Sequence, residues 1–502
     1  MRVLFHGGRV LTPGGVVGWA LVEGDTIAGT GSAGDEPEAD RRIDLDGGVL
    51  LSSFCDAHVH LPATGLYAAG MDFRGETSSR AILAAFAERA QRADSILFGG
   101  NFEDPLDLPL TAALLDESVG ERPALLARAD MHSCVVSSAL LRELDVRGLE
   151  GVDVEDGDPT GYLREEAAGA AWRWFDASLP RSQQRDAIRA AVSLAYSKGV
   201  TSVHEMFVVE WRGWDSLDVF QEAVDGVALQ IVLYVATDEV ERVRDMGLPR
   251  IGGDYFLDGS FGSHTAWLSQ PYATAPPEGS PPAGISYRDD AELLELFRAA
   301  QESFLQMGVH AIGDAAIEQA ISTWEKVAAE TGEDGVRSLG HRIEHFECAS
   351  DDHIERAARL GLRASVQPAF DHYWGGDGGL YARRIGAERA LQMNRFGTMS
   401  RKGVRLGAGS DSTVTPLDPF LQVAALRGHH VEAERLDAAA ALEMHTVGSR
   451  AMAGDASAGV IAAGQRADLV LVDRDPLETP AEHLTQTEVL GTWIAGERVW
   501  PA

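Results

Sequence analysis

The sequence predicts an α/β protein: a (β/α)8 TIM barrel, a small β-sandwich built from both ends of the chain, and an insertion after the first barrel strand. Three observations predict this fold class. Short β-branched runs alternate with Ala-, Leu- and Glu-rich helical stretches through the middle of the chain, as in parallel βα units. Glycine-punctuated strand patterns occur at both ends. A segment too long for one crossover separates the first two strand candidates.

The two ends of the chain are predicted to form one β-domain, from residues 1–50 and 455–502. The first stretch contains VLFHGG, GWALVEGDTIAGTG and RRIDLDGGVLL, and the last contains GVIAAGQRADLVLVD and LGTWIAGERVW. Fragments of two or three strands are marginally stable in water, so we expect both ends to pair into one β-sandwich.

Residues 51–454 are predicted to form the barrel, because helical patterns follow most of its strand candidates. The segment of about 70–170 is read as an insertion with its own strands, SILFGG and PALLARADMHS, and its own helices. The eight barrel strands are expected to end near His60, Met206, Ala236, Asp258, Asp314, Glu347, Pro368 and Asp411.

Length, composition and charge exclude several classes of protein. A chain of 502 residues exceeds one ordinary core, which favours a large domain with an accessory one. With 45% apolar and 24% charged residues, neither a disordered nor a fibrous protein is expected. Acidic residues outnumber basic ones 77 to 43, and the resulting net charge of −34 repels phosphate backbones and anionic lipid surfaces. We therefore expect no nucleic-acid or membrane partner.

Cysteine usage and the first residues predict a cytoplasmic location. Cys55, Cys134 and Cys348 are too few for a disulfide framework and are typical of a reducing compartment. The opening MRVLFHGGRVLTPGG lacks the apolar core of a signal peptide, and no apolar run approaches the roughly 20 residues of a membrane span.

Metal-ligand residue types recur where barrel strands are predicted to end. His58 and His60 lie two apart in FCDAHVH, so one face of a strand carries both imidazoles. Such a pair also arises by chance, and a polar strand end is the alternative. His310 in GVHAIGD, His345 in HRIEHFE and Asp411 in LGAGSDS follow at later strand ends. Because the carboxyl ends of barrel strands converge, these side chains can meet around one divalent ion. Zn²⁺ suits this donor set best, while Fe²⁺, Mn²⁺ and Ni²⁺ stay open.

These motifs resemble the amidohydrolase superfamily and, within it, the YtcJ-like metal-dependent hydrolases, which include N-substituted formamide deformylases. The resemblance spans nearly the whole chain through DAHVH, GVTSVHEM, FLDGSFGSHTAWLSQPY, HAIGDAAIEQAI, RIEHFE, SVQPAF, GAGSDSTVTPLDPF and GVIAAGQRADLVLVD. It implies a distorted barrel with a β-sandwich from both termini. It also implies metal-site roles for His58, His60, His310, His345 and Asp411, with Asp411 exchanging protons with the bound water.

One position departs from the family pattern. Where relatives carry a carbamylated lysine that bridges two metals on strand four, this sequence reads IGGDYFLDGS, with Asp254. The three lysines of the chain lie elsewhere in the predicted fold. We therefore expect one tightly bound ion, with Asp254 as a possible extra ligand. A second ion stays open, and Asp254 would then bridge the two ions directly, through a side chain shorter than a carbamylated lysine. Glu205 and Cys55 are further candidates, and for each the alternative is inward-facing barrel filler.

Three residues are candidates for substrate contact. His264 and Trp267 in GSFGSHTAWL follow strand four, where loops face the barrel mouth, and relatives often have arginine at the position of His264. His132 in ADMHSC resembles a family position that leans over the site, and a loop histidine with satisfied hydrogen bonds is the alternative. Glu165 matches a recurrent family segment, and we interpret it as part of a solvated helix face.

The predicted function is hydrolysis of a C–N bond in a small-molecule amide, N-formyl or N-acyl compound. A metal ion lowers the pKa of its bound water, so that metal-bound hydroxide forms near neutral pH. Asp411 would carry the proton to the leaving nitrogen, and His345 or His264 would steady the oxyanion. The alternatives are a mononuclear deaminase that releases ammonia from a heterocycle or amidine, and a non-catalytic scaffold. A homo-oligomer stays open, as is common among relatives.

Overall fold

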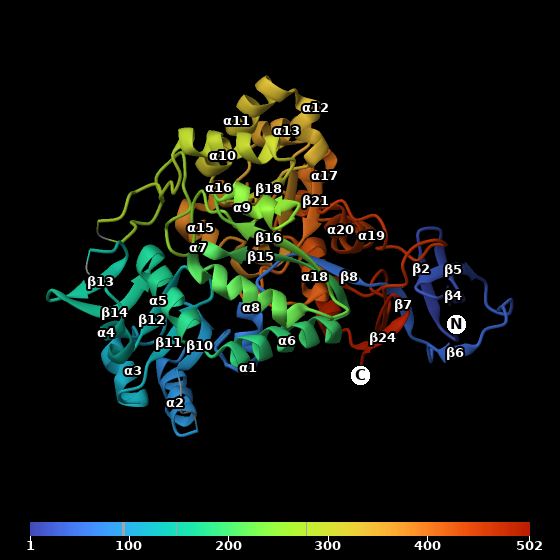
Figure 1. Ribbon diagram of the computed structural model, residues 1–502, viewed down its shortest axis with the longest axis horizontal. Coiled ribbons are helices and arrows are strands. Elements are labelled where there is room, and N and C mark those ends of the chain that lie inside the picture. The colour runs from blue at the N-terminus through green and yellow to red at the C-terminus, as the bar shows by residue number, and fades with distance from the viewer. Residues whose placement is uncertain (93–95, 147, 278, 502) are drawn as a thin grey trace.

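The computed structural model describes residues 1–92, 96–146, 148–277 and 279–501. Helices and parallel strands alternate through the centre of the chain, which confirms the predicted α/β class. Figure 1 shows the central strands surrounded by helices, the insertion at the lower left and the terminal strands at the right. Within the described part of the chain, no helix is both long and apolar enough to cross a membrane.

Eight central strands form two parallel sheets. In chain order they are β8 (Phe54–Val59), β15 (Val200–Val208), β16 (Gln230–Ala236), β17 (Arg250–Ile251), β18 (Gln306–Ala311), β19 (Arg342–His345), β20 (Arg363–Val366) and β21 (Arg405–Ala408). One sheet has the order β16-β15-β8, and the other runs from β17 to β21 in sequence.

Hydrogen bonds connect the two sheets at both edges. At one edge Gly252 N donates to Val235 O, and at the other Asp411 N donates to His58 O, each at 2.8 Å. A parallel bridge between Val59 and Ser412 extends the second connection. All eight strands therefore point the same way, and their carboxyl ends lie at the same end of the structure.

The fourth strand is shorter than the sequence predicts. We expected it to end near Asp258, but β17 ends at Ile251 and only Phe256 forms an isolated bridge, with His310. Gly252 and Gly253 have φ of 79° and 77°, a left-handed conformation that interrupts a strand. The segment that carries Asp254 is therefore a loop at the carboxyl end of β17.

Helices cover the outside of the strands because each has an apolar face. In α11 (Asp314–Thr331), buried Ile317, Ile321 and Trp324 recur at helical spacing. The Trp324 ring stacks on Phe297 of α10 (Asp290–Glu302) at 4.2 Å between centroids. These helix side chains belong to one large apolar cluster, which also contains buried side chains of the central strands.

Strands from the two ends of the chain pair in one sheet. Leu471 of β22 (Leu469–Val472) lies opposite Leu50 of β7 (Val49–Ser52) in an antiparallel ladder. In Figure 1 these N- and C-terminal segments lie side by side. The six-stranded sheet has the order β24-β23-β22-β7-β2-β3, and its remaining strands are β24 (Glu497–Trp500), β23 (Val489–Ile494), β2 (Arg9–Thr12) and β3 (Gly15–Val17).

A second terminal sheet shares its apolar core with the first. Its order is β5-β4-β1-β6, from β5 (Thr26–Gly31), β4 (Trp19–Glu23), β1 (Arg2–His6) and β6 (Arg41–Asp44). Phe5 of β1 packs edge-on against Trp493 of β23, with ring centroids 5.2 Å apart. Both rings belong to one apolar cluster drawn from the two sheets.

The segment between β8 and β15 contains a separate mixed sheet. Its order is β13-β14-β12-β11-β10-β9, from β13 (Val152–Glu155), β14 (Asp158–Arg164), β12 (Ser133–Val136), β11 (Ala124–Arg128), β10 (Leu97–Phe102) and β9 (Met71–Asp72). Helices α2 (Ser79–Ala90), α3 (Ala112–Val119) and α4 (Ser138–Glu143) accompany it, and α5 (Glu165–Ser178) follows. The β11–β12 turn carries Asp130 and His132 toward the carboxyl ends of the central strands, where both line a pocket.

Candidate metal centre and its pocket

Six potential metal donors from five of the central strands or the loops that follow them lie together. They are His58 and His60 at β8, Asp254 after β17, His310 in β18, His345 at the end of β19, and Asp411 after β21. All are buried except His60, which is partly exposed. The structure therefore brings together the five residues singled out as ligands and Asp254, from positions up to 353 residues apart in the printed numbering.

Asp254 lies at the centre of this group. Its Oδ2 atom is 3.1 Å from His60 Nε2 and 3.5 Å from His58 Nε2. Its Oδ1 atom is 3.3 Å from His310 Nδ1 and 3.5 Å from His345 Nε2. Each carboxylate oxygen therefore faces a different pair of imidazoles.

Asp411 approaches one of these pairs. Its Oδ1 atom is 3.2 Å from His60 Nε2 and 3.6 Å from His58 Nε2. The backbone of Asp411 has a φ of 50°, and that of His345 has a φ of 71°. Left-handed conformations are unfavourable for residues other than glycine and concentrate at functional sites, so these two side chains are held in place by the surrounding structure.

Three imidazoles are oriented through their Nδ1 atoms. His58 Nδ1 lies 2.9 Å from Glu344 Oε2, and His345 Nδ1 lies 2.7 Å from Gln367 Oε1. His60 Nδ1 donates to the Met206 carbonyl at 2.9 Å. These contacts leave the Nε2 atoms directed at the two carboxylates.

Within the part of the chain that the structure describes, the buried Nε2 atoms of His58 and His345 have no hydrogen-bond partner. An unpaired buried nitrogen costs free energy, and metal-ligating histidines commonly use one ring nitrogen for a protein partner and the other for the ion. Imidazole and carboxylate donors are also the types that divalent Zn²⁺ prefers. The residues present therefore fit a divalent metal ion.

The charges of the site stabilise ionised carboxylates. Burial acts to raise the pKa of Asp254, but the imidazoles of His58, His310 and His345 hold it well below its usual range. Burial likewise acts against ionised Asp411, but His58 and His60 lower its pKa. Burial acts to lower the pKa of His60, and Asp254 and Asp411 raise it to about 9. Both carboxylates are thus negative at neutral pH and available to a cation.

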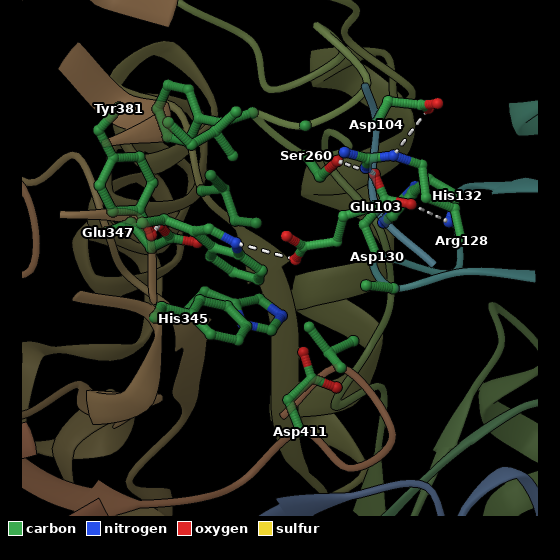
Figure 2. A pocket seen from close by; sticks show the side chains of 18 of the residues that line it. Glu103, Asp104, Arg128, Asp130, His132, Ser260, His345, Glu347, Tyr381 and Asp411 are labelled. Carbon is green, nitrogen blue, oxygen red and sulfur yellow. Dashed lines mark hydrogen bonds and ion pairs between the residues drawn. The ribbon is translucent and has the colours of Figure 1, made fainter. Parts of the chain in front are cut away.

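A pocket opens above the donors, between the central strands and the insertion. Figure 2 shows His345 and Asp411 on one side of it and Asp104, Arg128 and His132 on the other. The apolar side chains that line it are Ala129, Phe261, Ile312, Phe370, Trp374, Leu380 and Val414. A small molecule that entered this pocket would meet the donors at its base.

The insertion residue His132 lines the pocket, and Glu165 orients it. His132 Nδ1 lies 3.2 Å from Glu165 Oε2, which also accepts a hydrogen bond from the Tyr287 hydroxyl. The side chain of Glu165 is only 14% exposed. Our interpretation of Glu165 as part of a solvated helix face is therefore wrong: its carboxylate turns inward, where the buried His132 and the partly buried Tyr287 hold it.

The other two substrate candidates lie outside the pocket lining among the described residues. His264 Nε2 lies 3.3 Å from Thr274 Oγ1, and its ring packs on Tyr272 at 5.0 Å between centroids. The backbone of Trp267 donates to Asp258 Oδ2 at 2.8 Å. Their predicted contact with substrate stays a prediction, which this arrangement does not support.

Glu205 and Cys55, the remaining ligand candidates, have other partners. Glu205 Oε2 accepts a hydrogen bond from Leu61 N at 2.7 Å. Cys55 Sγ lies 3.7 Å from His204 Nε2, and burial raises the pKa of its thiol to about 11. A thiol in that state is a poor metal ligand, because the thiolate is the form that binds.

Sequence reasoning missed the residues that orient the donors. Arg342 Nε and Nη2 each donate to Glu344 at 2.8 Å, and Glu344 in turn contacts His58. The alternation in RIEH could have placed Arg342 and Glu344 on one strand face, but not beside His58. No sequence pattern pointed to the contact of Gln367 with His345.

The chain is similar to known hydrolases over nearly its whole length. A model of the amidohydrolase family matches residues 41–500. The whole chain aligns at 30% identity with 99% of YtcJ of Bacillus subtilis (strain 168), itself named an amidohydrolase. Identity is 25% to the N-substituted formamide deformylase of Arthrobacter pascens, over 98% of this chain and 94% of that protein. An uncharacterized metal-dependent hydrolase from Pyrococcus furiosus has a TM-score of 0.74 and 27% identity, over 95% of this chain and 100% of that one.

Proposed function

Because the chain belongs to the amidohydrolase family, we propose that it is a metal-dependent hydrolase that cleaves a carbon–nitrogen bond in a small-molecule amide, N-formyl or N-acyl compound. The observation that carries the proposal is the buried group of four imidazoles and two carboxylates at the base of a pocket. Two of its inward nitrogens have no hydrogen-bond partner among the described residues, which is rare for buried polar atoms in a purely structural cluster.

The proposal includes the finer architecture. The eight central strands form a distorted (β/α)8 barrel over residues 51–454, with the insertion at about 70–170, and the hydrogen bonds at both sheet edges support this closure. Residues 1–50 and 455–502 form the β-sandwich, supported by the apolar core that their two sheets share.

The proposed ligands are His58, His60, His310, His345 and Asp411, together with Asp254. A divalent ion held there, with Zn²⁺ the best match to the donors, would polarise a carbonyl and lower the pKa of a water molecule to around 7. The protein would supply the rest by holding the donors and excluding bulk water with the apolar pocket wall.

Asp411 is proposed to carry the proton. Its carboxylate lies beside His58 and His60 and also lines the pocket, so it can reach both the donors and a substrate. Ionised Asp411 would accept a proton from the attacking water and return it to the leaving nitrogen. His345, which lines the same pocket, is proposed to adjoin the substrate carbonyl as well as to bind metal.

His132 is the proposed substrate contact from the insertion. Its ring centroid is 6.1 Å from that of His310, and Glu165 fixes its orientation through Nδ1. The Nε2 atom is left for a hydrogen bond to the substrate amide. The substituent of the amide would lie against Phe370 and Trp374, whose indole donates to Glu103 of the insertion at 3.3 Å.

We also propose a cytoplasmic location, on the grounds that all three cysteines are free and two are buried.

A hydrolysis screen tests the function. Purified enzyme loaded with Zn²⁺ would be assayed on N-acyl amino acids, N-formyl amines and cyclic amides for release of the amine or acid. Turnover that a chelator abolishes and added metal restores is the expected result. Ammonia release from purines, pyrimidines or amidines, without amide hydrolysis, would instead establish the deaminase alternative. No turnover on either panel by metal-loaded protein would favour a scaffold.

A further inference from the structure

Glu347 is a buried carboxylate of the pocket that the proposed reaction does not use. It follows His345 in the loop after β19, and it is only 3% exposed. Its Oε2 atom accepts a hydrogen bond from the Tyr381 hydroxyl at 2.5 Å, whereas no described residue donates a hydrogen bond to Oε1. In Figure 2 Glu347 and Tyr381 lie together, on the side of the pocket that carries His345. One oxygen of Glu347 is therefore left for a molecule in the pocket.

The charge of Glu347 has no partner of opposite sign. Within the described part of the chain, no arginine or lysine forms an ion pair with it. Glu344, three positions earlier, is by contrast paired with Arg342 at 2.8 Å. Carboxylates are almost never fully buried without such a partner, because burial removes the water that stabilises their charge. An unpaired carboxylate in a pocket wall indicates a ligand that supplies the positive charge.

The other charged side chains of the pocket also favour a cation. Five carboxylates line it, against two guanidinium groups: Glu103, Asp104, Asp130, Glu347 and Asp411 against Arg128 and Arg383. Arg128 is paired with Asp104 and Asp130, and Arg383 donates to the Gly378 carbonyl. Both guanidinium groups are thus engaged by the protein itself. The excess of carboxylates attracts a positively charged substituent and repels an anionic one.

Aromatic rings in the same pocket suit an organic cation. Phe370 and Trp374 have ring centroids 4.7 Å apart, and Trp374 Nε1 donates to Glu103 Oε1 at 3.3 Å. Ammonium and guanidinium groups are attracted to the faces of such rings. An aromatic wall together with an unpaired carboxylate therefore favours a protonated amine over a hydrated metal ion.

We propose that the pocket selects amides whose substituent carries a protonated amine, and that Glu347 Oε1 accepts a hydrogen bond from this ammonium group. The choice of amides rests on the proposed function, whereas the cation site does not. Glu347 lies two residues after His345, so their Cα atoms are at most about 7 Å apart. We therefore expect a short alkyl spacer between the amide and the amine.

Binding of propylguanidinium to full-length, Zn²⁺-loaded protein tests the cation site without any turnover. A guanidinium group stays protonated, so it does not bind the metal ion, and it donates readily to a carboxylate. Isothermal titration calorimetry should show affinity about 10- to 100-fold weaker in folded Glu347→Gln than in the wild-type protein, as for the loss of a hydrogen bond between charged groups. Glu103→Gln removes the same charge from an exposed position of the pocket. It is the matched control and should weaken binding much less.

A second measurement compares substrates. N-formyl derivatives of diaminopropane, diaminobutane and diaminopentane would each be assayed against the N-formyl alkylamine that has a methyl group in place of the ammonium group. In the wild-type protein, kcat/KM for at least one cationic compound should exceed that of its neutral analogue about tenfold or more. Glu347→Gln should lose this preference.

Wild-type protein that does not bind propylguanidinium would overturn the inference, and so would equal affinity in folded Glu347→Gln. Equal losses in Glu103→Gln and Glu347→Gln would overturn it as well, because they would show a diffuse field and not a contact. Neutral analogues hydrolysed at least as well as the cationic compounds by the wild-type protein would contradict it however the variants fold. Binding of propylguanidinium that depends on Glu347, without hydrolysis of any amide, would support the cation site and count against the proposed function.

Discussion

His58 Nδ1 lies 2.9 Å from Glu344 Oε2, and both side chains are fully buried. Arg342 binds both oxygens of that carboxylate, so three side chains form a continuous chain that ends at the candidate metal centre. The contact fixes the ring of His58 with Nε2 toward Asp254 and Asp411. A carboxylate in this position also makes the imidazole a stronger ligand.

Replacing Glu344 with glutamine should therefore weaken metal binding. Losing such a partner typically costs about 10- to 100-fold in metal affinity, which competition with a chromophoric chelator would measure. The variant should also unfold at a lower temperature, because the buried charge of Arg342 loses its ion pair with Glu344. Unchanged metal affinity in folded Glu344→Gln would show that this contact does not orient the ligand.

Asp411→Asn separates proton transfer from metal binding. The amide keeps an oxygen beside His58 and His60, so much of the bound metal should remain. Without a carboxylate to accept the proton, kcat should fall by about 10²- to 10⁴-fold. Metal analysis and steady-state kinetics on the same preparation check both expectations, and full activity would reject the proton-carrying role.

Glu165→Gln should affect substrate handling but not metal content. The variant loses the carboxylate that holds His132 and accepts from Tyr287, so the imidazole is oriented less firmly. A loss of about 1.4 kcal/mol in transition-state binding corresponds to roughly a tenfold lower kcat/KM. Tyr287→Phe, which leaves the Glu165 contact with His132 intact, is the matched control and should have the smaller effect. Equal kcat/KM in wild type and Glu165→Gln would show that this pair does not act on the substrate.

The buried imidazole of His341 should make the free energy of unfolding depend on pH. It lies outside the metal site, where Met307 N donates to its Nδ1 and its ring stacks on Trp324 at 3.7 Å between centroids. Burial, with a contribution from Arg363, lowers its pKa from 6.5 to about 3. Below pH 6.5 the unfolded chain therefore binds a proton that the folded protein does not. This contribution to stability is complete above pH 6.5 and declines as the pH falls toward 3.

Urea unfolding at pH 7 and pH 5 checks this sign. The group should account for about 2 kcal/mol of stability lost between these values. His341→Gln has no titrating ring and should show a correspondingly smaller pH dependence, whatever its stability at pH 7. The same pH dependence in both proteins would contradict a neutral, buried His341.

The donor positions could be predicted because they follow from strand periodicity and strand ends. His58 and His60 lie two apart, and His310, His345 and Asp411 occur where parallel strands end. Because the carboxyl ends of parallel barrel strands lie together, this local pattern was enough to predict that the five side chains meet. The α/β class and the family resemblance were confirmed. Asp254 was noticed as a departure, but its central position depends on the close approach allowed by two glycines.

The contacts that orient the histidines could not be predicted. They join residues far apart in sequence, and they depend on where each side chain points in the folded structure. Glu344 meets His58 across 286 residues, and Tyr287 meets Glu165 across 122. The direction of a loop side chain is hard to predict for the same reason. His264 follows β17 in sequence, but it is not among the residues that line the pocket. Its backbone is left-handed, with a φ of 59°, and its ring packs against Tyr272.

Metal content tests the central claim most directly. Wild-type protein and His58→Ala would be loaded with Zn²⁺, freed of loosely bound ions by gel filtration and analysed by mass spectrometry for metal per chain. We predict stoichiometric Zn²⁺ in the wild-type protein and only traces in folded His58→Ala. Folded wild-type protein that retains no metal, or His58→Ala that retains as much as wild type, would contradict a metal centre at these residues.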